Sequence, residues 1–258
     1  MYELKPENIL KHSDKEAVSL NDIWFRYEKS GADVLKGLSL KIYQGEFTAI
    51  LGGNGMGKST ALSIICSLNK PYRGKVEISP LNKSSFDTLV AVLPQNPQTL
   101  FLKKTVLEDL YEVFDGRKIS KEEKERRVTS AVKLCRLESL CNRHPYDLSG
   151  GEQQRIAIAR IILQDAPVII LDEATAYADP ENEVLVQKAF EEMAVGKTVI
   201  MIAHRLTTVK NADTIYVFEN GKIKEAGKHE ALLEANGLYG KMWNDYQTSI
   251  RWKVGGSK

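Results

Sequence analysis

The residues best suited to chemistry lie between Gly52 and Thr60, which read Gly-Gly-Asn-Gly-Met-Gly-Lys-Ser-Thr and contain the pattern G-x-x-x-x-G-K-S. Glycines let the backbone turn tightly and point its N–H groups at phosphate oxygens. Lys58 adds a positive charge for the β- and γ-phosphates, and the Ser59 hydroxyl can bind Mg²⁺. The predicted phosphate-binding residues are Gly52, Asn54, Gly55, Gly57, Lys58, Ser59 and Thr60.

The segments on either side of this loop support the phosphate interpretation over a glycine-rich surface turn. Residues 46–51 read as a buried strand, and residues 59–68 read as a helix. The N-terminal end of such a helix dipole favours an anion. A strand, a glycine loop and a helix in this order are the context that the motif requires.

A second chemical element follows the apolar run Val168–Leu171, which leads directly into Asp172 and Glu173. An acid at the carboxyl end of a parallel strand lies at the edge where α/β sheets bind ligands. Asp172 can hold Mg²⁺ through water, and Glu173 can orient or deprotonate the attacking water. The alternative is an acidic pair at a helix N-terminus with no catalytic role, and the phosphate loop earlier in the chain argues against it.

The third element is a second glycine turn, Leu148-Ser-Gly-Gly-Glu-Gln153, which opens another helix. Such a turn also offers N–H groups and a helix-dipole end to an anion. Two phosphate-binding elements in one chain make sense if the second completes the site of a neighbouring molecule, so the sequence predicts a dimer.

Strands and helices alternate along the chain in the way that positions these elements. Strands are expected at 18–27, around Leu38, Leu40 and Ile42, and at 75–78, 89–93, 168–171 and 198–202. A hairpin is expected around Asn220-Gly221, which is a strong turn signal, and two short helices are expected between His229 and Tyr246. The charged, helical segment from about 105 to 146 interrupts this alternation.

The predicted fold is α/β, with a P-loop NTPase core of mainly parallel sheet, an antiparallel N-terminal β-subdomain and an inserted helical subdomain. We expect residues 1–16 to be a tail or linker, 17–240 to form a single nucleotide-binding domain with the helical subdomain at about 96–154, and 241–258 to be a C-terminal tail.

Composition excludes several classes of protein. The 258 residues carry a net charge of only +2, so no strong field points to nucleic acid. No apolar run approaches the roughly 20 residues that span a bilayer, and the N-terminus lacks a signal-peptide core. Three cysteines, Cys66, Cys135 and Cys141, fit reduced thiols in a cytoplasmic protein better than disulfides or a metal site.

Together, the phosphate loop, Leu148-Ser-Gly-Gly-Glu152 and Leu171-Asp-Glu173 resemble the ATP-binding cassette ATPases, and the resemblance covers nearly the whole chain from Val18 onward. The family implies ATP and Mg²⁺ as cofactors. It also implies contacts to the nucleotide of a second subunit from Ser149, Gly150, Gly151 and Glu152. Glu152 stands where many members carry glutamine, which is a common variant.

The resemblance also implies roles for four residues that would otherwise be unremarkable. Tyr27 matches the aromatic residue that stacks on adenine, although it could instead be a core aromatic of its strand. Gln95 matches the glutamine that contacts Mg²⁺ and water and senses the transport partner. Asp179 matches the aspartate at the dimer contact, and His204 matches the switch histidine at the γ-phosphate.

The implied function is ATP hydrolysis that drives a membrane transporter, through a head-to-tail dimer that sandwiches two ATP molecules. The implied partners are a second ATPase subunit, identical or different, and transmembrane transporter subunits, with no nucleic acid. The implied location is cytoplasmic, at the inner face of the membrane. One alternative is a soluble cassette ATPase acting on nucleic acid or ribosomes, and another is a non-catalytic nucleotide-binding module.

A finer comparison divides the chain. Residues 18–148 resemble the ATPases of energy-coupling-factor importers, with Leu93-Pro-Gln-Asn-Pro-Gln98 among the carrying motifs. The stretch from Glu173 to Asn182, Ile202-Ala-His-Arg-Leu206 and the tail from Trp243 to Trp252 resemble exporter-type cassettes, including siderophore-type ones. We interpret the chain as a hybrid, natural or assembled, joined near the helix that the second glycine turn opens. The alternative is that sequence shared across the family gives the appearance of a hybrid. A hybrid could have intact ATP chemistry and no working transporter partner.

Overall fold

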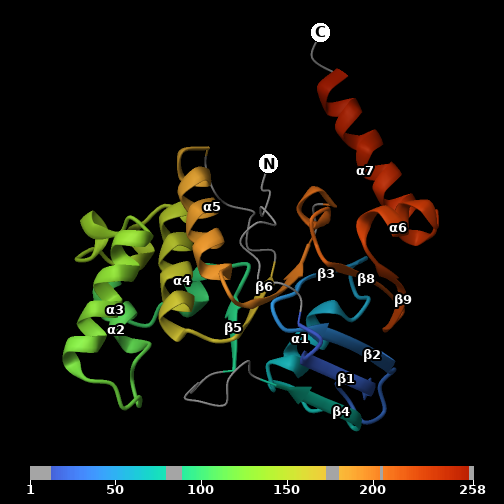
Figure 1. The fold of residues 1–258 in the computed structure, drawn as a ribbon, viewed down its shortest axis with the longest axis horizontal. Helices are drawn as coiled ribbons and strands as arrows, with labels where there is room; N and C mark the ends of the chain where they lie inside the picture. Colours follow the sequence, from blue (N-terminus) through green and yellow to red (C-terminus); the bar gives the residue numbers. More distant parts are fainter. Residues whose placement is uncertain (1–12, 80–88, 173–179, 204–205, 256–258) are drawn as a thin grey trace. The chain divides into compact units, whose positions relative to one another are not determined.

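A computed structural model describes residues 13–79, 89–172, 180–203 and 206–255. The chain divides into two compact units. The first contains the described residues of 13–79 and 200–255, and the second contains those of 89–199. Both are shown in Figure 1, in which colour follows the sequence.

An antiparallel sheet of order β2-β1-β4 forms one part of the first unit, as predicted (Figure 1). Its strands are β1 (Glu16–Phe25), β2 (Leu35–Tyr43) and β4 (Arg73–Ile78). In β2, Leu38, Leu40 and Ile42 are buried while Ser39 and Lys41 are exposed. This alternation is the expected pattern for a strand with one face on the core.

The parallel strands of the first unit support the phosphate loop. Strand β3 (Phe47–Gly52) pairs in parallel with β8 (Thr214–Glu219), which pairs antiparallel with β9 (Lys222–Gly227). The turn between β8 and β9 has positive φ at both Asn220 (51°) and Gly221 (78°). Those angles belong to the two-residue hairpin turn that the Asn-Gly pair predicts.

Strand β7 (Thr198–Ile202) carries the chain from the second unit into the first. After it, the Ala203 N–H donates to the Ile50 carbonyl of β3 at 3.3 Å. The helices of the first unit are α1 (Lys58–Ile65), a short 3₁₀ turn η5 (Leu206–Val209), α6 (His229–Glu234) and α7 (Leu238–Gly255). Helix α7 is longer than predicted, because no proline or glycine interrupts residues 241–254.

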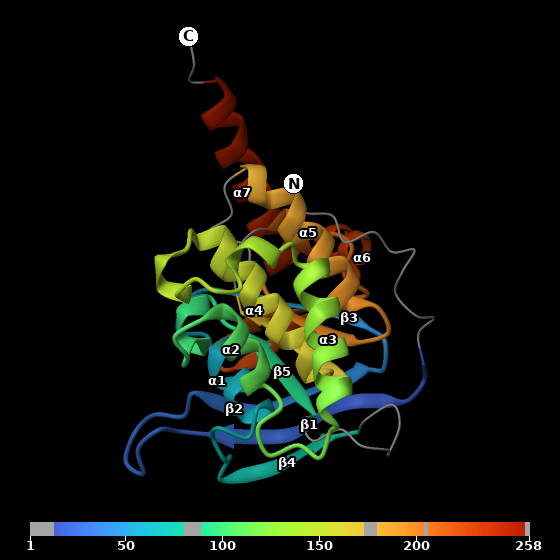
Figure 2. The same cartoon turned by 90° about the vertical axis from the view of Figure 1, so that its left-hand side faces the viewer.

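The second unit combines two parallel strands with a helical group. Strands β5 (Val90–Leu93) and β6 (Val168–Asp172) pair in parallel. Figure 2 shows α2, α3 and α4 packed together, and α4 also packs against α5 and β5. The helices are α2 (Val106–Glu112), α3 (Lys121–Leu134), α4 (Gly150–Gln164) and α5 (Pro180–Ala194), with short 3₁₀ turns η2 (Pro97–Leu100), η3 (Glu138–Leu140) and η4 (Pro145–Asp147).

The expected helical insertion at about 96–154 lies within the second unit, together with β5, β6 and α5. Its boundaries stay a prediction. Within the insertion, α3 buries Val128, Ala131 and Val132 and exposes most of its charged residues. None of the helices in the described part of the chain is both long and apolar enough to cross a membrane.

Candidate functional site

The predicted phosphate loop joins the end of β3 to the start of α1, and its shape depends on glycine. Gly52 has φ 145° and Gly57 has φ 96°, angles that side-chain-bearing residues rarely adopt. A Cβ atom at position 52 would lie 2.6 Å from the Phe218 carbonyl oxygen of β8. The strand beside the loop therefore leaves room for hydrogen alone at this position.

The hairpin turn between β8 and β9 also packs against the loop. A Cβ at Gly57 would lie 2.7 Å from Leu35 Cδ2 and 3.7 Å from the Cα of Gly221. The Asn220 N–H donates to the Met56 sulfur at 3.3 Å. Residues more than 160 positions later in the chain thus fix the backbone of the loop.

Lys58 begins α1 and is buried beside the loop. Its Nζ donates to the carbonyl oxygens of Gly52 at 2.8 Å and Gly53 at 2.9 Å. No side chain caps this helix, because the N-cap residue is Gly57. A positive charge and an uncapped helix N-terminus in the same loop can bind a polyphosphate.

Three of the other predicted residues of the loop are open to a ligand. Asn54, Gly55 and Ser59 are exposed, whereas Thr60 is buried in the first turn of α1. The predicted base-stacking residue, Tyr27, follows β1, and 66% of its surface is exposed. Its hydroxyl lies 3.0 Å from Thr60 Oγ1, so the structure brings Tyr27 to the phosphate loop.

In the second unit, the structure brings Gln95 and Asp172 to the same edge of a parallel strand pair. Leu93 of β5 is in register with Leu171 of β6. Asp172 directly follows Leu171, and Gln95 follows Leu93 after one intervening proline, Pro94. Gln95 is exposed and Asp172 is half-buried. A carboxylate and an amide oxygen are donors that suit Mg²⁺.

The second glycine turn opens α4, as predicted, but its N-terminus is already capped. The Ser149 hydroxyl accepts from the Glu152 N–H at 3.4 Å and donates to Glu152 Oε2 at 3.0 Å. The same carboxylate oxygen accepts from the Ser149 N–H at 2.9 Å. This is a capping box, and its sequence signal, Ser149-x-x-Glu152, was present in the motif that we assigned to phosphate binding alone.

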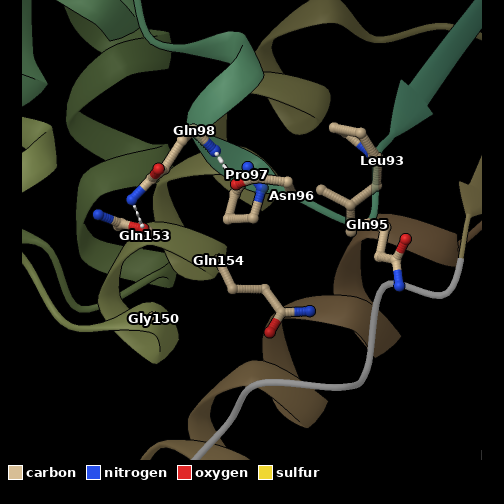
Figure 3. A pocket seen from close by; sticks show the side chains of 9 residues that line it. Leu93, Gln95, Asn96, Pro97, Gln98, Gly150, Gln153 and Gln154 are labelled. Atoms are coloured by element: carbon tan, nitrogen blue, oxygen red, sulfur yellow. Dashed lines mark hydrogen bonds between the residues drawn. The ribbon is translucent and has the colours of Figure 1, made fainter.

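Next to this turn is a pocket of about 290 Å³ lined by side-chain amides. Figure 3 shows Gln98 and Gln153 joined by a hydrogen bond of 3.2 Å, while Gln154 extends away from that pair on the side of Gln95. Gln154 is only 5% exposed, yet its Oε1 has no hydrogen-bond partner among the described residues. The residues lining the pocket are Leu93, Pro94, Gln95, Asn96, Pro97, Gln98, Gly150, Gln153 and Gln154.

Exposed apolar groups border this pocket. The Tyr146 hydroxyl donates to the Gln98 carbonyl at 3.2 Å, and its ring meets the edge of Phe101 at 6.4 Å between centroids. Tyr146 is 52% exposed and Leu102, next to Phe101, is 70% exposed. We call the amide-lined pocket with Leu102 and Tyr146 the amide face.

A buried ionic cluster, which the sequence analysis missed, holds the rim of the amide face in place. Asp109 Oδ1 accepts from the N–H groups of Leu102 at 2.9 Å and Lys103 at 3.1 Å. Arg160 of α4 reaches the same carboxylate at 3.3 Å and Glu112 at 3.0 Å. Burial raises the pKa of Asp109, while the Leu102 N–H and the Arg160 charge oppose that rise. These partners lie up to 51 residues apart, so no local pattern marks them.

Three predicted site residues, Glu173, Asp179 and His204, lie outside the described residues. Their assignments stay predictions. The remaining residues fall into two groups. Tyr27 and the phosphate loop belong to the first unit, and Gln95, Asp172 and the second glycine turn belong to the second.

The fold and the phosphate loop define a P-loop NTPase of the α/β class. A family model described as "ABC transporter" matches residues 35–176, which is more than half of the chain. The chain therefore belongs to the ABC transporter family and is an ATPase domain of that family, as the resemblance predicted.

Relatives with established names agree with this assignment. An ATP-dependent lipid A-core flippase of Neisseria meningitidis is 37% identical over 88% of this chain, which spans 38% of that protein. The leptomycin B resistance protein pmd1 of Schizosaccharomyces pombe is also 37% identical over 88% of this chain, which spans 18% of it. The chain thus corresponds to less than half the length of these relatives.

Two solved structures resemble the chain over most of its length. A bacterial Atm1-family ABC exporter with ATP bound has a TM-score of 0.76 and 28% identity, and the match covers 93% of this chain and 43% of the exporter chain. The protein cbiO1 of Clostridium perfringens, part of the ABC transporter complex cbiONQ, has a TM-score of 0.72 and 27% identity over 87% of this chain and 96% of its own. The similarity to an exporter and to a protein of the cbiONQ complex agrees with the sequence, which resembles both importer-type and exporter-type cassettes.

Proposed function

We propose that this chain hydrolyses ATP to power a membrane transporter, as one half of a head-to-tail dimer that encloses two nucleotides. The observation that carries the proposal is the phosphate loop. It combines backbone angles that require glycine, a buried lysine and an uncapped helix N-terminus. Each of these features favours a bound polyphosphate, and together they leave little other use for the loop.

In this proposal Lys58 moves from the carbonyl oxygens of Gly52 and Gly53 to the β- and γ-phosphates. The lysine then exchanges two neutral acceptors for a polyanion. Its hydrogen bonds become stronger, because bonds between two charged groups are roughly twice as strong as bonds between neutral ones. The exposed loop residues Asn54 and Gly55 direct their N–H groups to the same phosphates.

The sequence motifs assign a Mg²⁺ ion to Ser59, Gln95 and Asp172, whose hydroxyl, amide and carboxylate oxygens are the hard donors that this ion prefers. When bound, Mg²⁺ supplies charge neutralisation at the phosphate oxygens. Glu173 is assigned to orient the attacking water and accept its proton, and His204 to contact the γ-phosphate. These roles rest on the motif positions in the sequence.

The second glycine turn is assigned to the nucleotide of the other subunit. Ser149, Gly150, Gly151 and Glu152 would close over the triphosphate held by the partner's phosphate loop, and Asp179 would lie at the same contact. The exposed Ser149 and Gly150 at the start of a 15-residue helix support this assignment. The capping box must then open or share its donors when the phosphate arrives.

We assign the transporter subunit to the amide face. The pocket is lined by uncharged amides, and the Gln154 Oε1 atom in it has no hydrogen-bond partner among the described residues. Leu102 and Tyr146 are exposed apolar residues of the same face. These features fit a neutral, partly apolar segment of protein with free backbone N–H groups. The segment from Gln95 to about Tyr146 contains most of this face, so it should decide which transporter binds. That segment is on the importer-like side of the hybrid comparison.

Phosphate release by the purified chain tests the catalytic proposal. We expect Glu173→Gln to bind ATP and to lose about 10²–10⁴-fold in turnover, because the amide cannot accept the proton of water. The variant should accumulate as an ATP-bound dimer on size-exclusion chromatography. The matched control is Glu192→Gln, the same change at an exposed position of α5, which should behave as wild type. Wild-type turnover in Glu173→Gln would remove that residue from the mechanism.

Co-expression with membrane subunits tests the docking proposal. We expect co-purification with an energy-coupling-factor-type membrane subunit, stimulation of ATP hydrolysis, and loss of both with Leu102→Asp. Leu68→Asp changes a leucine that is 78% exposed in the first unit and should have no effect. Binding only to an exporter-type membrane domain would refute the importer assignment. Binding to neither would favour a hybrid with ATP chemistry and no working partner, and ribosome association would favour the soluble alternative.

A further inference from the structure

The hydrogen bond between Tyr27 and Thr60 joins two parts of the proposed ATP site that are 33 residues apart in sequence. Tyr27 is 66% exposed, whereas Thr60 is only 6% exposed and lies in the first turn of α1. Most of the tyrosine surface is therefore open to solvent, while its hydroxyl is bonded to the helix that follows the phosphate loop. An exposed tyrosine without this contact would sample several rotamers.

A second contact sets the tilt of the same ring. Phe25 and Tyr27 meet edge to face, with centroids 5.0 Å apart and planes at 87°. The chain around them is also fixed, because the Val34 N–H donates to the Phe25 carbonyl at 2.8 Å and Arg26 pairs with Asp33 at 2.9 Å. The two residues that precede Tyr27 are therefore anchored, and the hydroxyl contact decides where the ring points.

We propose that Thr60 is a positioning residue for the nucleotide base, acting through the Tyr27 hydroxyl. This inference rests on the proposed function, in which Tyr27 stacks on adenine. A ring already held in its stacking orientation loses less conformational freedom when the base arrives. Because its hydroxyl partner lies one residue after Ser59, a displacement of the first turn of α1 by phosphates also moves the ring. Base stacking and phosphate binding thereby become coupled.

The alternative is that the hydroxyl pair only stabilises the fold of the first unit. A purely structural bond would weaken binding of every ligand equally, or of none. Coupling through the ring instead predicts a loss of affinity only for ligands that carry a base, and no loss for a ligand without one. Tripolyphosphate is such a ligand, and comparing it with ATP separates the two roles.

The experiment measures dissociation constants of ATP, GTP and tripolyphosphate for wild type, Tyr27→Phe, Thr60→Val and the double variant. We expect Tyr27→Phe to weaken ATP and GTP by the same factor, about 3–10-fold, because stacking uses the π-face that purines share. Its affinity for tripolyphosphate should not change. In the Thr60→Val background, the same tyrosine change should have no further effect on ATP.

Two controls keep the result interpretable. Thr60→Ser retains a hydroxyl at the same position and should keep the effect of Tyr27→Phe. Tyr216→Phe removes a tyrosine hydroxyl of the same unit, bonded to the Lys41 carbonyl at 2.6 Å, and should leave all three affinities unchanged. It reports what the loss of one tyrosine hydrogen bond does to the fold.

Three results with the variants would overturn the inference. The first is that Tyr27→Phe binds ATP as tightly as wild type. The second is that Tyr27→Phe loses as much affinity for tripolyphosphate as for ATP. The third is that Tyr27→Phe weakens ATP binding by the same factor in the Thr60→Val background as in wild type. Wild-type protein that binds tripolyphosphate but gains nothing from the base would refute the inference and leave the phosphate loop intact. Wild-type protein that binds none of the three ligands would refute the proposed function itself.

Discussion

The phosphate loop before α1 and the glycine turn before α4 are both glycine-rich, yet their helix N-termini are satisfied differently. In the phosphate loop, Gly52 and Gly57 adopt positive φ angles and no side chain caps the helix. In the turn before α4, Ser149 and Glu152 close a capping box. The backbone of the first leaves the helix N-terminus open, as the proposed phosphate site requires, whereas side chains already bind the N–H groups of the second.

This contrast teaches what the glycines of each turn are for. At Gly52 the neighbouring strand excludes any side chain, so glycine is demanded by the folded chain itself. Gly150 is the first residue of an ordinary α-helix, is exposed and has no positive φ angle. Its backbone angles do not require glycine, which favours a role in closely approaching a ligand.

The sharpest test of the contrast exchanges glycine for alanine in each turn. Gly52→Ala should destabilise the protein by about 2–6 kcal/mol, from backbone strain of roughly 1–3 kcal/mol and overpacking of similar size. Gly150→Ala should be neutral or stabilising by up to about 1 kcal/mol, because alanine is the better helix former. Urea unfolding monitored by circular dichroism measures both. Equal stability of the two variants would show that the phosphate loop does not need its glycine.

Lys58→Ala tests whether the phosphate loop depends on charge as well as shape. We expect ATP hydrolysis to fall on the order of 10²–10³-fold, as is typical when one group that stabilises developing charge is removed. ATP affinity should also fall. The fold should persist, because the two carbonyl oxygens that lose the lysine lie at the very end of β3 and in the loop after it. Turnover equal to wild type in a folded variant would contradict the assignment.

Removal of the cap tests the other turn. Ser149→Ala should lower stability by about 1 kcal/mol, since it leaves the Glu152 N–H without its partner. Ser120→Ala is a matched control, because Ser120 caps α3 in the same unit by accepting from the Glu123 N–H at 3.2 Å. Both variants should lose similar stability, but only Ser149→Ala should weaken the ATP-dependent dimer. Equal dimerisation would show that Ser149 serves its helix alone.

The smallest effect is expected for Glu152→Gln, which keeps the hydrogen bonds of the capping box and removes the charge. Loss of favourable interaction with the helix dipole should cost about 0.3–1 kcal/mol of stability. The proposed dimer should become tighter, because a carboxylate no longer faces the partner's triphosphate. Dimerisation of Glu173→Gln protein, with and without this change, is measured by analytical ultracentrifugation at fixed ATP. A weaker dimer would place Glu152 in direct contact with the nucleotide.

Local patterns in the sequence predicted much of this molecule because local physics determines it. The alternation in residues 38–42, the Asn220-Gly221 turn and the apolar run 168–171 each specify an element within a few residues. The phosphate loop belongs to the same class, since the motif includes its own strand and helix.

The contacts that sequence reasoning missed join residues far apart. Tyr27 and Thr60, Gln98 and Gln153, and Asp109 and Arg160 are separated by 33, 55 and 51 positions. A pairing of this kind depends on how elements pack, and a tyrosine or glutamine gives no periodic signal of its partner. The exception is the capping box at Ser149, whose four-residue pattern was readable but had been assigned wholly to phosphate binding.

The support that the Asn220–Gly221 turn gives the phosphate loop has a consequence for synthesis. Gly57, Met56 and Gly52 rest on residues 218–221, so the ribosome adds about 160 further residues after Thr60 before that support exists. At common elongation rates this takes roughly 8–30 s. Throughout that interval the phosphate loop of the nascent chain lacks its contacts with residues 218–221. The nucleotide site is therefore expected to form late, after the helices of the second unit have emerged.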